Sequence, residues 1–294
     1  MPLPSVICFG EILWDFLPDG IFPGGAPFNV GYHLHQLGVP THIVSAVGQD
    51  VLGDELKRRL EVWGLPVDAI TRPRALPTGF VRATLGANGD AHYEIMPGVA
   101  WDAIDVSEPT LAHAAAAGAI IYGSLAQRSR HNRTALTRLL AALPSSAWRV
   151  FDVNLRAPYD DLALVRELAG QATLLKLNHE EAARLIGERA QAAQGEAHAR
   201  TLAAETGANT IVITAGAAGA GLLRAGEWHW EKSLSIQVMD TVGAGDAFLA
   251  ALVAHLLQGA SAPASLAHAC RLGEWVASQR GATPAHPAAP PTPS

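Results

Sequence analysis

The chain has 294 residues, 49% of them hydrophobic and 16% charged, with a formal net charge of −6. This composition predicts a compact soluble enzyme with a large core, built as one domain with an accessory element or as two domains. The acidic balance argues against a nucleic-acid partner and against an anionic membrane surface. No apolar run approaches the roughly 20 residues of a membrane helix, and the first residues show no signal-peptide pattern, so we expect a cytoplasmic protein.

The two cysteines, Cys8 and Cys270, lie among apolar or small residues and outside any CxxC spacing. We expect both to be reduced thiols within the core.

Short apolar runs alternate with helical segments along most of the chain. Strands are expected at 5–9, 41–47, 119–122, 149–153, 173–177 and 210–214, and helices at 26–38, 51–63, 131–142, 161–169, 179–186 and 197–206. This alternation predicts an α/β fold with a doubly wound, mostly parallel sheet covered by helices on both faces.

One region departs from the alternation. Residues 77–85 and 91–95 are strand-like and flank the segment 86–90, whose Asn-Gly pair is typical of a β-hairpin turn. With residues 11–16 extended nearby, these strands predict a small sheet that projects from a single domain spanning 1–294, with its strands at about 11–22 and 77–97. An edge hairpin of the main sheet is the alternative. The Pro/Ala-rich residues 283–294 lack any pattern and predict a loose tail.

The run DTVGAGDAF at 240–248 carries the strongest chemical signal. Gly243 and Gly245 let a phosphate approach the main chain, and the first-turn amides of the following apolar helix lack internal partners. An anion therefore suits this helix N-terminus. Asp246 is better placed as a base for an acceptor hydroxyl than as a phosphate ligand. The alternative is a helix cap on an ordinary turn.

A second motif, PGGAPFNVG at 23–31, opens a helix with small residues. The Asn29 amide can donate to and accept from a sugar hydroxyl, and Asp15 upstream can accept two hydroxyl hydrogens. Taken alone, Asn29 can equally cap its helix and Asp15 can be a solvated charge.

These motifs resemble the two signatures of the PfkB (ribokinase-like) family of carbohydrate kinases, and the resemblance spans residues 10–282. It implies a ribokinase-like fold whose small β-sheet closes as a lid over the sugar, with ATP as phosphate donor and Mg²⁺ as cofactor. Asp246 takes the position of the catalytic base, and the amides of Gly243, Ala244 and Gly245 that of the anion hole.

The resemblance also implies further binding roles. On the sugar side these fall to Asp15, Gly25, Asn29, Arg82, Tyr93, Asn154 and Arg156. On the nucleotide side they fall to Asn178, Thr214, Gly216, Gly219, Gly245 and His268. Glu181 is implied to hold Mg²⁺ through water, and Asp240 with the main chain of Val242 to hold a monovalent cation, with potassium dependence left open. For Asn178 and Glu181 a helix cap, for Arg156 a surface salt bridge and for His268 ordinary packing are the alternatives.

Among family substrates, the opening residues 10–15, the run 24–29, residues 99–102 and the DxNxR element at 152–156 look most like bacterial fructokinases. We therefore expect phosphorylation of fructose to fructose 6-phosphate, with ribose and 2-keto-3-deoxygluconate as alternative sugars. A sugar-sensing protein without turnover is an alternative of a different class. Monomer and lid-mediated homodimer both stay open. A dinucleotide-dependent oxidoreductase is disfavoured, because no glycine fingerprint follows the first strand.

Overall fold

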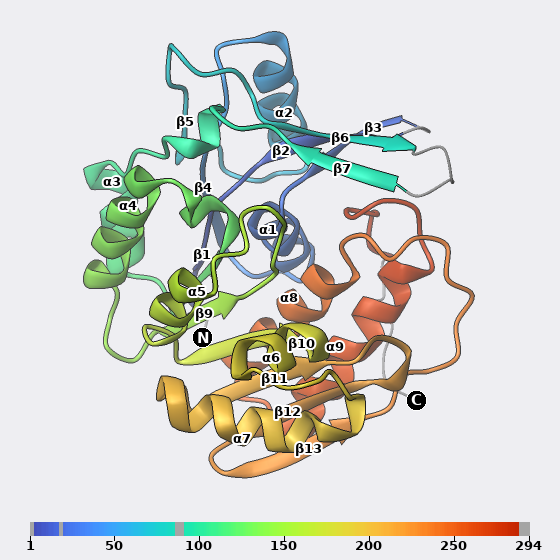
Figure 1. Ribbon diagram of the computed structural model, residues 1–294. Helices are drawn as coiled ribbons and strands as arrows, with labels where there is room; N and C mark the ends of the chain where they lie inside the picture. The colour runs from blue at the N-terminus through green and yellow to red at the C-terminus, as the bar shows by residue number, and fades with distance from the viewer. Residues whose placement is uncertain (1–2, 18–19, 86–90, 288–294) are drawn as a thin grey trace.

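The computed structural model describes residues 3–17, 20–85 and 91–287 of the chain. Within these ranges nine strands form one large sheet in the order β13-β12-β11-β10-β9-β8-β1-β4-β5 (Figure 1). The core strands run parallel, and only β12 and β13 join as an antiparallel edge. The bounds are β1 (Val6–Phe9), β4 (Thr41–Ala46), β5 (Ile70–Thr71), β8 (Ala119–Gly123), β9 (Trp148–Asp152), β10 (Leu174–Asn178), β11 (Thr210–Thr214), β12 (Ala220–Arg224) and β13 (Glu227–Glu231).

Helices cover both faces of this sheet. One face carries α1 (Ala26–Gln36), α2 (Val51–Val62), α8 (Ala244–Leu257) and α9 (Ala262–Ala277), and the other carries α3 (Glu108–Ala115), α4 (Arg130–Ala142), α5 (Leu162–Ala169), α6 (His179–Ile186) and α7 (Gly195–Thr206). Successive strand residues therefore enter opposite cores: Val6 and Cys8 pack toward α8 and α9, whereas Ile7 and Phe9 pack toward the other layer. Burial on both faces explains why the strands read as continuous apolar runs. The predicted doubly wound fold is confirmed.

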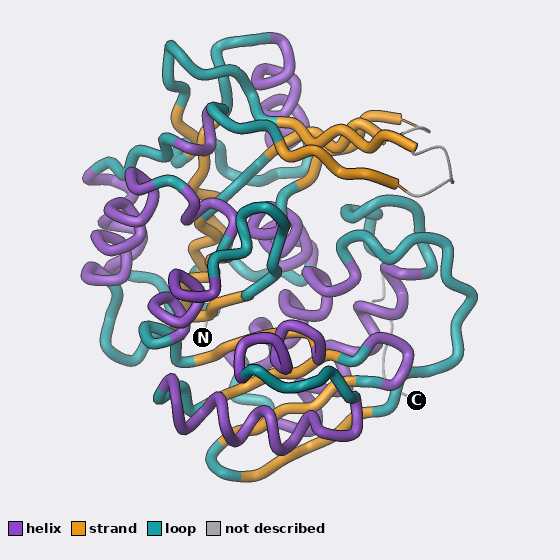
Figure 2. The backbone as a smooth tube through the Cα atoms, in the orientation of Figure 1, coloured by secondary structure: helices purple, strands orange, loops and turns teal. Residues whose placement is uncertain are grey.

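A second, smaller sheet in the order β3-β2-β6-β7 projects from the main body as the lid (Figures 1 and 2). It contains β2 (Leu13–Leu17), β3 (Gly20–Gly24), β6 (Phe80–Leu85) and β7 (Ala91–Ile95). The predicted hairpin is the antiparallel pair β6–β7, and β2 pairs parallel to β6. The alternative of an edge hairpin on the main sheet is therefore wrong. The predicted turn at 86–90 lies outside the described residues.

The C-terminal segment departs from expectation. The Tyr32 hydroxyl donates to the carbonyl of Pro284 at 3.2 Å, and a hydrogen bond of 2.8 Å joins the ring nitrogens of His33 and His286. Burial lowers the pKa of His33 to about 3, so this ring is neutral. Residues 283–287 are thus packed against α1 rather than loose, and residues 288–294 lie outside the described part of the chain. The composition of the segment does not reveal that His286 bonds to His33 on α1.

Both cysteines are buried free thiols, as predicted. None of the described helices is long and apolar enough to cross a membrane.

Candidate active site

The two signature motifs meet in space. Asn29 lies in the first turn of α1 and Asp246 in the first turn of α8, and these two helices pack against each other. The Asn29 Nδ2 donates to Asp246 Oδ2 at 2.8 Å, across 217 residues of sequence. Asn29 is 4% exposed, and its Oδ1 is buried without a partner in the described part of the structure. An acceptor is thereby left open beside the carboxylate.

The surroundings of Asp246 raise the pKa of its carboxyl. Burial, together with the nearby Asp152 carboxylate, raises the pKa of its carboxyl to about 6, from an ordinary value of 3.8. Lys176, the Asn29 hydrogen bond and Arg156 act in the opposite direction. A carboxylate with a pKa just below the working pH is ionised yet basic enough to take a proton during reaction. This environment suits a general base better than a simple helix cap.

The glycine turn before Asp246 has the conformation that the sequence requires. Gly243 caps α8 with φ of +78°, a left-handed backbone, and a Cβ there would lie 2.6 Å from Ala282 Cα. The Ala244 amide donates to Thr241 O at 3.3 Å and the Asp246 amide to Gly243 O at 3.1 Å. Among the described residues, the amides of Gly243 and Gly245 have no partner. The Ala244 amide is thus already engaged, which leaves the amides of Gly243 and Gly245 for the predicted anion hole; that role stays a prediction.

A buried ion pair lies beneath this turn. Lys176 in β10 and Asp152 in β9 are opposite each other in the parallel ladder, and Lys176 Nζ contacts the two carboxylate oxygens at 2.8 and 2.9 Å. Burial works against the charge on Lys176, but Asp152 and Asp246 outweigh it and raise its pKa. A Cβ at Gly245 would lie 3.5 Å from Nζ, so the ammonium is directed at the turn.

Sequence reasoning assigned no role to Lys176 and used Asp152 only as the first residue of the DxNxR element. A signal for the pair was present, however, because Lys176 interrupts the apolar strand β10 and Asp152 is a buried charge at the end of β9. Charges at such positions are retained only when they are paired or functional.

Asp15 and Glu11, from the N-terminal part of the chain, are two further largely buried carboxyls of the site. Burial raises the pKa of Asp15 in β2 to about 6, and Asp246 raises it further. Gly24 on the neighbouring strand leaves no room for a Cβ beside the Asp15 carboxylate. Burial also raises the pKa of Glu11 to about 7, and its Oε1 accepts from the Ala26 amide at 3.2 Å. Gly25, the residue before α1, packs against the main chain of Glu11. Glu11 was not predicted as a site residue.

The end of β9 supplies the positive charge for these acids. Asn154 has a φ of +40°, rare for a residue other than glycine, and Arg156 follows it on the exposed side. The Arg156 guanidinium lowers the pKa of Glu11, Asp15 and Asp246 alike. Arg156 is thus near enough to these carboxyls to offset part of their negative charge.

The lid register separates the two predicted lid contacts. Arg82 pairs with Phe16 of β2 and is exposed, with its guanidinium 5.8 Å from the Phe80 ring centroid. Asp15 precedes Phe16 and therefore belongs to the opposite face. The register thus places Arg82 on the face of the lid opposite Asp15, and its sugar contact stays a prediction. Tyr93 is opposite Ala83 in β6, and its side chain lies outside the described part of the molecule.

Asn178 and Glu181 form a reciprocal helix cap. The Asn178 side chain accepts from the amides of Glu180 and Glu181 at 2.9 and 2.8 Å, and Glu181 Oε2 accepts from the Asn178 amide at 2.9 Å. Glu181 Oε1 accepts from the Leu155 amide at 2.8 Å. Burial raises the pKa of Glu181. Each oxygen can still accept one more hydrogen bond, so this carboxylate fits the predicted contact with a magnesium-bound water.

The predicted nucleotide loop follows β11. Thr214 ends that strand, with its hydroxyl 3.5 Å from Leu177 O, and Gly216 begins the short 3₁₀ helix Gly216–Ala218 that Gly219 ends. His268 on α9 stacks on His255 of α8, with ring centroids 4.0 Å apart. Because this stacking occupies one face of the ring, packing accounts for His268 at least as well as the predicted adenine contact.

Asp240 ties two loops together before the glycine turn. Its Oδ1 accepts from the Val242 amide at 3.0 Å and its Oδ2 from the Gly281 amide at 3.2 Å. These bonds fix the segment that the sequence assigned to a monovalent cation; potassium binding stays a prediction.

The pfkB family carbohydrate kinase model matches residues 20–289 of the chain. The chain belongs to this family. The fructokinase of Escherichia coli is 28% identical over 266 residues, covering 86% of this chain and 84% of that protein. A structure of fructokinase from Vibrio cholerae O395 in the fructose, ADP and calcium ion bound form superposes with a TM-score of 0.82 at 22% identity, covering 96% of each chain.

The ribokinase of Arabidopsis thaliana complexed with ribose and ATP superposes with a TM-score of 0.81 at 21% identity, covering 98% of this chain and 96% of the ribokinase. Both the large sheet and the lid of this pfkB kinase are thus those of sugar kinases. The site described above lies at the edge of the sheet where ligands of open α/β folds bind, beyond the carboxyl ends of β9, β10 and β11.

Proposed function

We propose that this carbohydrate kinase transfers the terminal phosphoryl group of ATP to fructose, forming fructose 6-phosphate, with Asp246 as the general base. The observation that carries the proposal is the 2.8 Å contact between Asn29 and Asp246. It joins the sugar-side motif to the phosphate-side turn, as a transfer between two substrates requires.

The base acts on a positioned hydroxyl. Asn29 holds one oxygen of Asp246, so the second oxygen is free to accept the hydrogen of the attacking hydroxyl. The buried Oδ1 of Asn29 can accept from a neighbouring sugar hydroxyl, and the Asp15 carboxylate can accept two more. Fixing the sugar oxygen in line with the phosphoryl group supplies much of the acceleration in such transfers.

Negative charge on the transferring phosphoryl group is met by fixed positive groups. The free amides of Gly243 and Gly245 and the N-terminal end of the α8 dipole lie beside Asp246. Lys176 stands beneath the same turn and Arg156 at its rim. Such preorganised donors stabilise the transition state more than the ground state.

Glu181 is the residue that would hold Mg²⁺, through water, and the bound ion would neutralise charge on the ATP phosphates. Its cap hydrogen bonds keep the carboxylate fixed in the absence of any ion. The loop from Thr214 to Gly219 is proposed to receive the nucleotide.

Fructose is proposed because of the fructokinase-like motifs and the fructokinase relatives, whose identity of about 28% leaves the sugar open to test. Ribose and 2-keto-3-deoxygluconate are the alternative acceptors. The sensor alternative is disfavoured by the raised pKa of Asp246, since a protein that only binds sugar has no need of a tuned base.

The test is ADP release with ATP and Mg²⁺ across fructose, ribose and 2-keto-3-deoxygluconate, with the phosphorylated position assigned by NMR. The proposal expects fructose to give the highest kcat/KM and the product to carry phosphate on O6. Asp246→Asn should abolish turnover, whereas the matched control Asp105→Asn, on an exposed acid paired with His131, should leave it unchanged. Turnover of a different sugar would overturn the substrate, and fructose binding without turnover would overturn the activity.

A further inference from the structure

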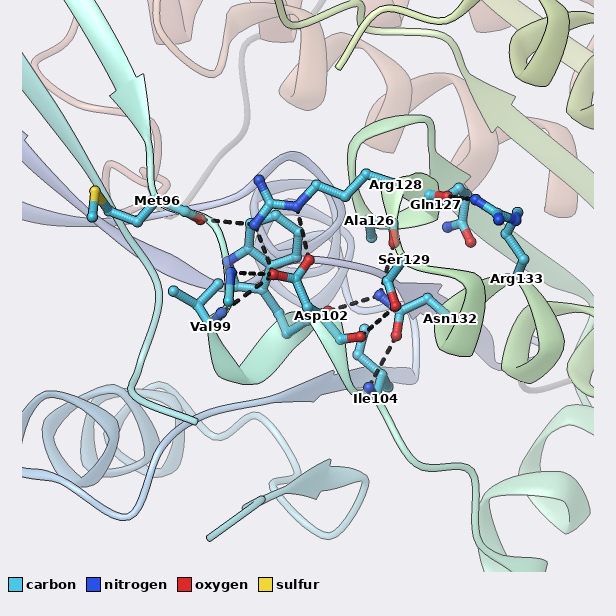
Figure 3. A network of polar contacts seen from close by, with 12 residues as sticks. Met96, Val99, Asp102, Ile104, Ala126, Gln127, Arg128, Ser129, Asn132 and Arg133 are labelled. Atoms are coloured by element: carbon cyan, nitrogen blue, oxygen red, sulfur yellow. Dashed lines mark hydrogen bonds and ion pairs between the residues drawn. The ribbon is translucent and has the colours of Figure 1, made fainter. Parts of the chain in front are cut away.

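Arg128 forms a polar junction at the root of the lid (Figure 3). It ends the 3₁₀ helix Leu125–Arg128 that follows β8, and its side chain is 9% exposed. Its Nε donates to Asp102 Oδ1 at 2.7 Å and its Nη2 to Asp102 Oδ2 at 2.9 Å. Nη2 also donates to the carbonyl of Met96 at 2.7 Å, directly after the end of β7. One guanidinium thus holds the point where the lid returns to the body.

Asp102 extends this hold along the returning chain. Its Oδ2 also accepts from the amides of Gly98 and Val99 at 3.0 and 3.2 Å. The outgoing chain is tied in the same place, because the Ala100 amide donates to Pro77 O at 2.7 Å. Thr78 beside it donates from its amide and its hydroxyl to Asp50, at 2.8 and 2.6 Å. We call residues 77–79 and 96–102 the lid root. Both segments of the lid root are therefore hydrogen-bonded to the body.

Arg128 also reaches the substrate loop, residues 154–159, which carries Asn154 and Arg156. The guanidinium carbon lies 3.9 Å from the Trp101 ring centroid and 4.4 Å from that of Tyr159. The Tyr159 amide donates to Arg156 O at 2.7 Å, so a main-chain turn connects the residue that bears this ring to Arg156. A cation packed against two aromatic rings couples the elements that bear them. Through this one side chain the lid root and the loop are linked.

The Arg128 side chain is not fully satisfied. Its Nη1 is buried and has no hydrogen-bond partner among the described residues. Figure 3 shows this nitrogen directed away from Asp102 and the lid-root bonds. A buried donor without an acceptor is unfavourable and therefore calls for a physical explanation. The Arg128 Nη1 can therefore donate a hydrogen bond to an oxygen that the described residues do not supply.

We propose that Arg128 is a positioning residue for the sugar: it locks the lid root to the substrate loop, and its spare Nη1 donor is completed when sugar is bound beneath the lid. The proposal rests on the sugar-kinase activity proposed above. It assigns Arg128 no part in the proton transfer, and it predicts that sugar affinity, rather than ATP affinity, depends on the junction.

The test compares steady-state kinetics of Arg128→Met and Arg128→Lys with wild type. We expect Arg128→Met to raise the sugar KM by about ten- to a hundredfold, because a charged hydrogen-bond set and a cation–ring contact are both lost. The ATP KM should stay within about twofold, since the contacts of Arg128 described above include no residue of the nucleotide loop 214–219. Arg128→Lys, which keeps the charge but not the planar fork, should lie between.

A second pair of variants keeps the proposal testable if Arg128→Met fails to fold. Tyr159→Leu removes only the ring from the loop side and should raise the sugar KM several-fold, and Tyr159→Phe, which keeps the ring, should restore it. The matched control is Arg138→Met on α4, another arginine that donates to a main-chain carbonyl, that of Val106, but touches neither lid root nor substrate loop. It should leave both KM values unchanged.

Hydrogen exchange supplies the readout that a purely structural role would not move. Sugar should slow amide exchange in residues 96–102 of wild type and have a much smaller effect in Arg128→Met or Tyr159→Leu. Lower thermal stability with unchanged sugar KM and unchanged sugar-induced protection would overturn the proposal. If wild type phosphorylates a sugar other than fructose, the comparison uses that sugar, so a wrong substrate and a wrong role for Arg128 give different results.

Discussion

Asp246→Asn separates catalysis from stability. The asparagine keeps an oxygen for the Asn29 hydrogen bond but cannot accept the substrate proton, so kcat should fall by about a hundred- to ten-thousandfold. In wild type, kcat/KM for the sugar should decline below a pH of about 6, where the carboxyl of the free enzyme becomes protonated. At pH 5 wild-type kcat/KM should be about one tenth of its plateau value, one pH unit below that pKa.

The same substitution should stabilise the fold at neutral pH. The pKa of Asp246 is about 6 in the folded protein against an ordinary 3.8, so the folded state holds this proton more tightly than the unfolded chain. The contribution of Asp246 to the free energy of unfolding is therefore greatest below pH 3.8 and falls as the pH rises to about 6. Above that window the ionised carboxylate costs at most about 3 kcal/mol, from the size of the shift. The uncharged asparagine avoids this cost.

Denaturant unfolding of both proteins at pH 8 and pH 4.5 measures the effect, with kcat measured on the same preparations. We expect the variant to be the more stable at pH 8 and its advantage to shrink markedly at pH 4.5. A variant that is inactive and also less stable at pH 8 would refute the account of Asp246 as a destabilised base. Full activity in the variant would refute its role as a base altogether.

Three further substitutions test neighbouring parts of the site. Asn29→Ala removes the hydrogen bond that lowers the pKa of Asp246, so the acid limb of the kcat/KM profile should move to higher pH; an unmoved limb would contradict this coupling. Lys176→Met leaves Asp152 buried and unpaired and should cost about 3–5 kcal/mol in denaturant unfolding, much of which Asp152→Asn should restore in the double variant; additive losses would refute the pairing. Gly243→Ala places a side chain at φ of +78° and should lower thermal stability and kcat together, which normal kcat would disprove.

The fold was predictable because its determinants are local. The helix His179–Ile186 and the strand Thr210–Thr214 have the predicted bounds, since Asn178 caps the first and apolar β-branched residues fill the second. The hairpin Ala220–Arg224 and Glu227–Glu231 was missed. It extends the sheet past the predicted parallel strands, although the alternation of polar residues with Trp228 and Trp230 in its second strand is itself a strand pattern that the sequence analysis did not use.

The site was predictable where a motif carried it and unpredictable where only packing did. Asp246 and Asn29 follow from two signatures, although their contact spans 217 residues and needs the folded chain. Arg82 and Tyr93 were predicted from the lid as a pair, yet strand register decides which face each position occupies. Arg128 belongs to no predicted motif, because its importance arises from Trp101, Asp102 and Tyr159, which come together only in three dimensions.

The ionisable groups of the site are electrostatically coupled to one another. Glu11, Asp15 and Asp246 are buried acids whose pKa values are each raised by burial, and Asp246 raises the other two. Arg156 lowers all three, so a change in one group shifts the protonation of the rest. A phosphoryl group arriving beside the glycine turn would draw on the same arginine and on Lys176. The positive charge that lowers the pKa values of these acids is thus also the charge available to stabilise the transition state. Binding of the phosphoryl group and the basicity of Asp246 are therefore coupled through it.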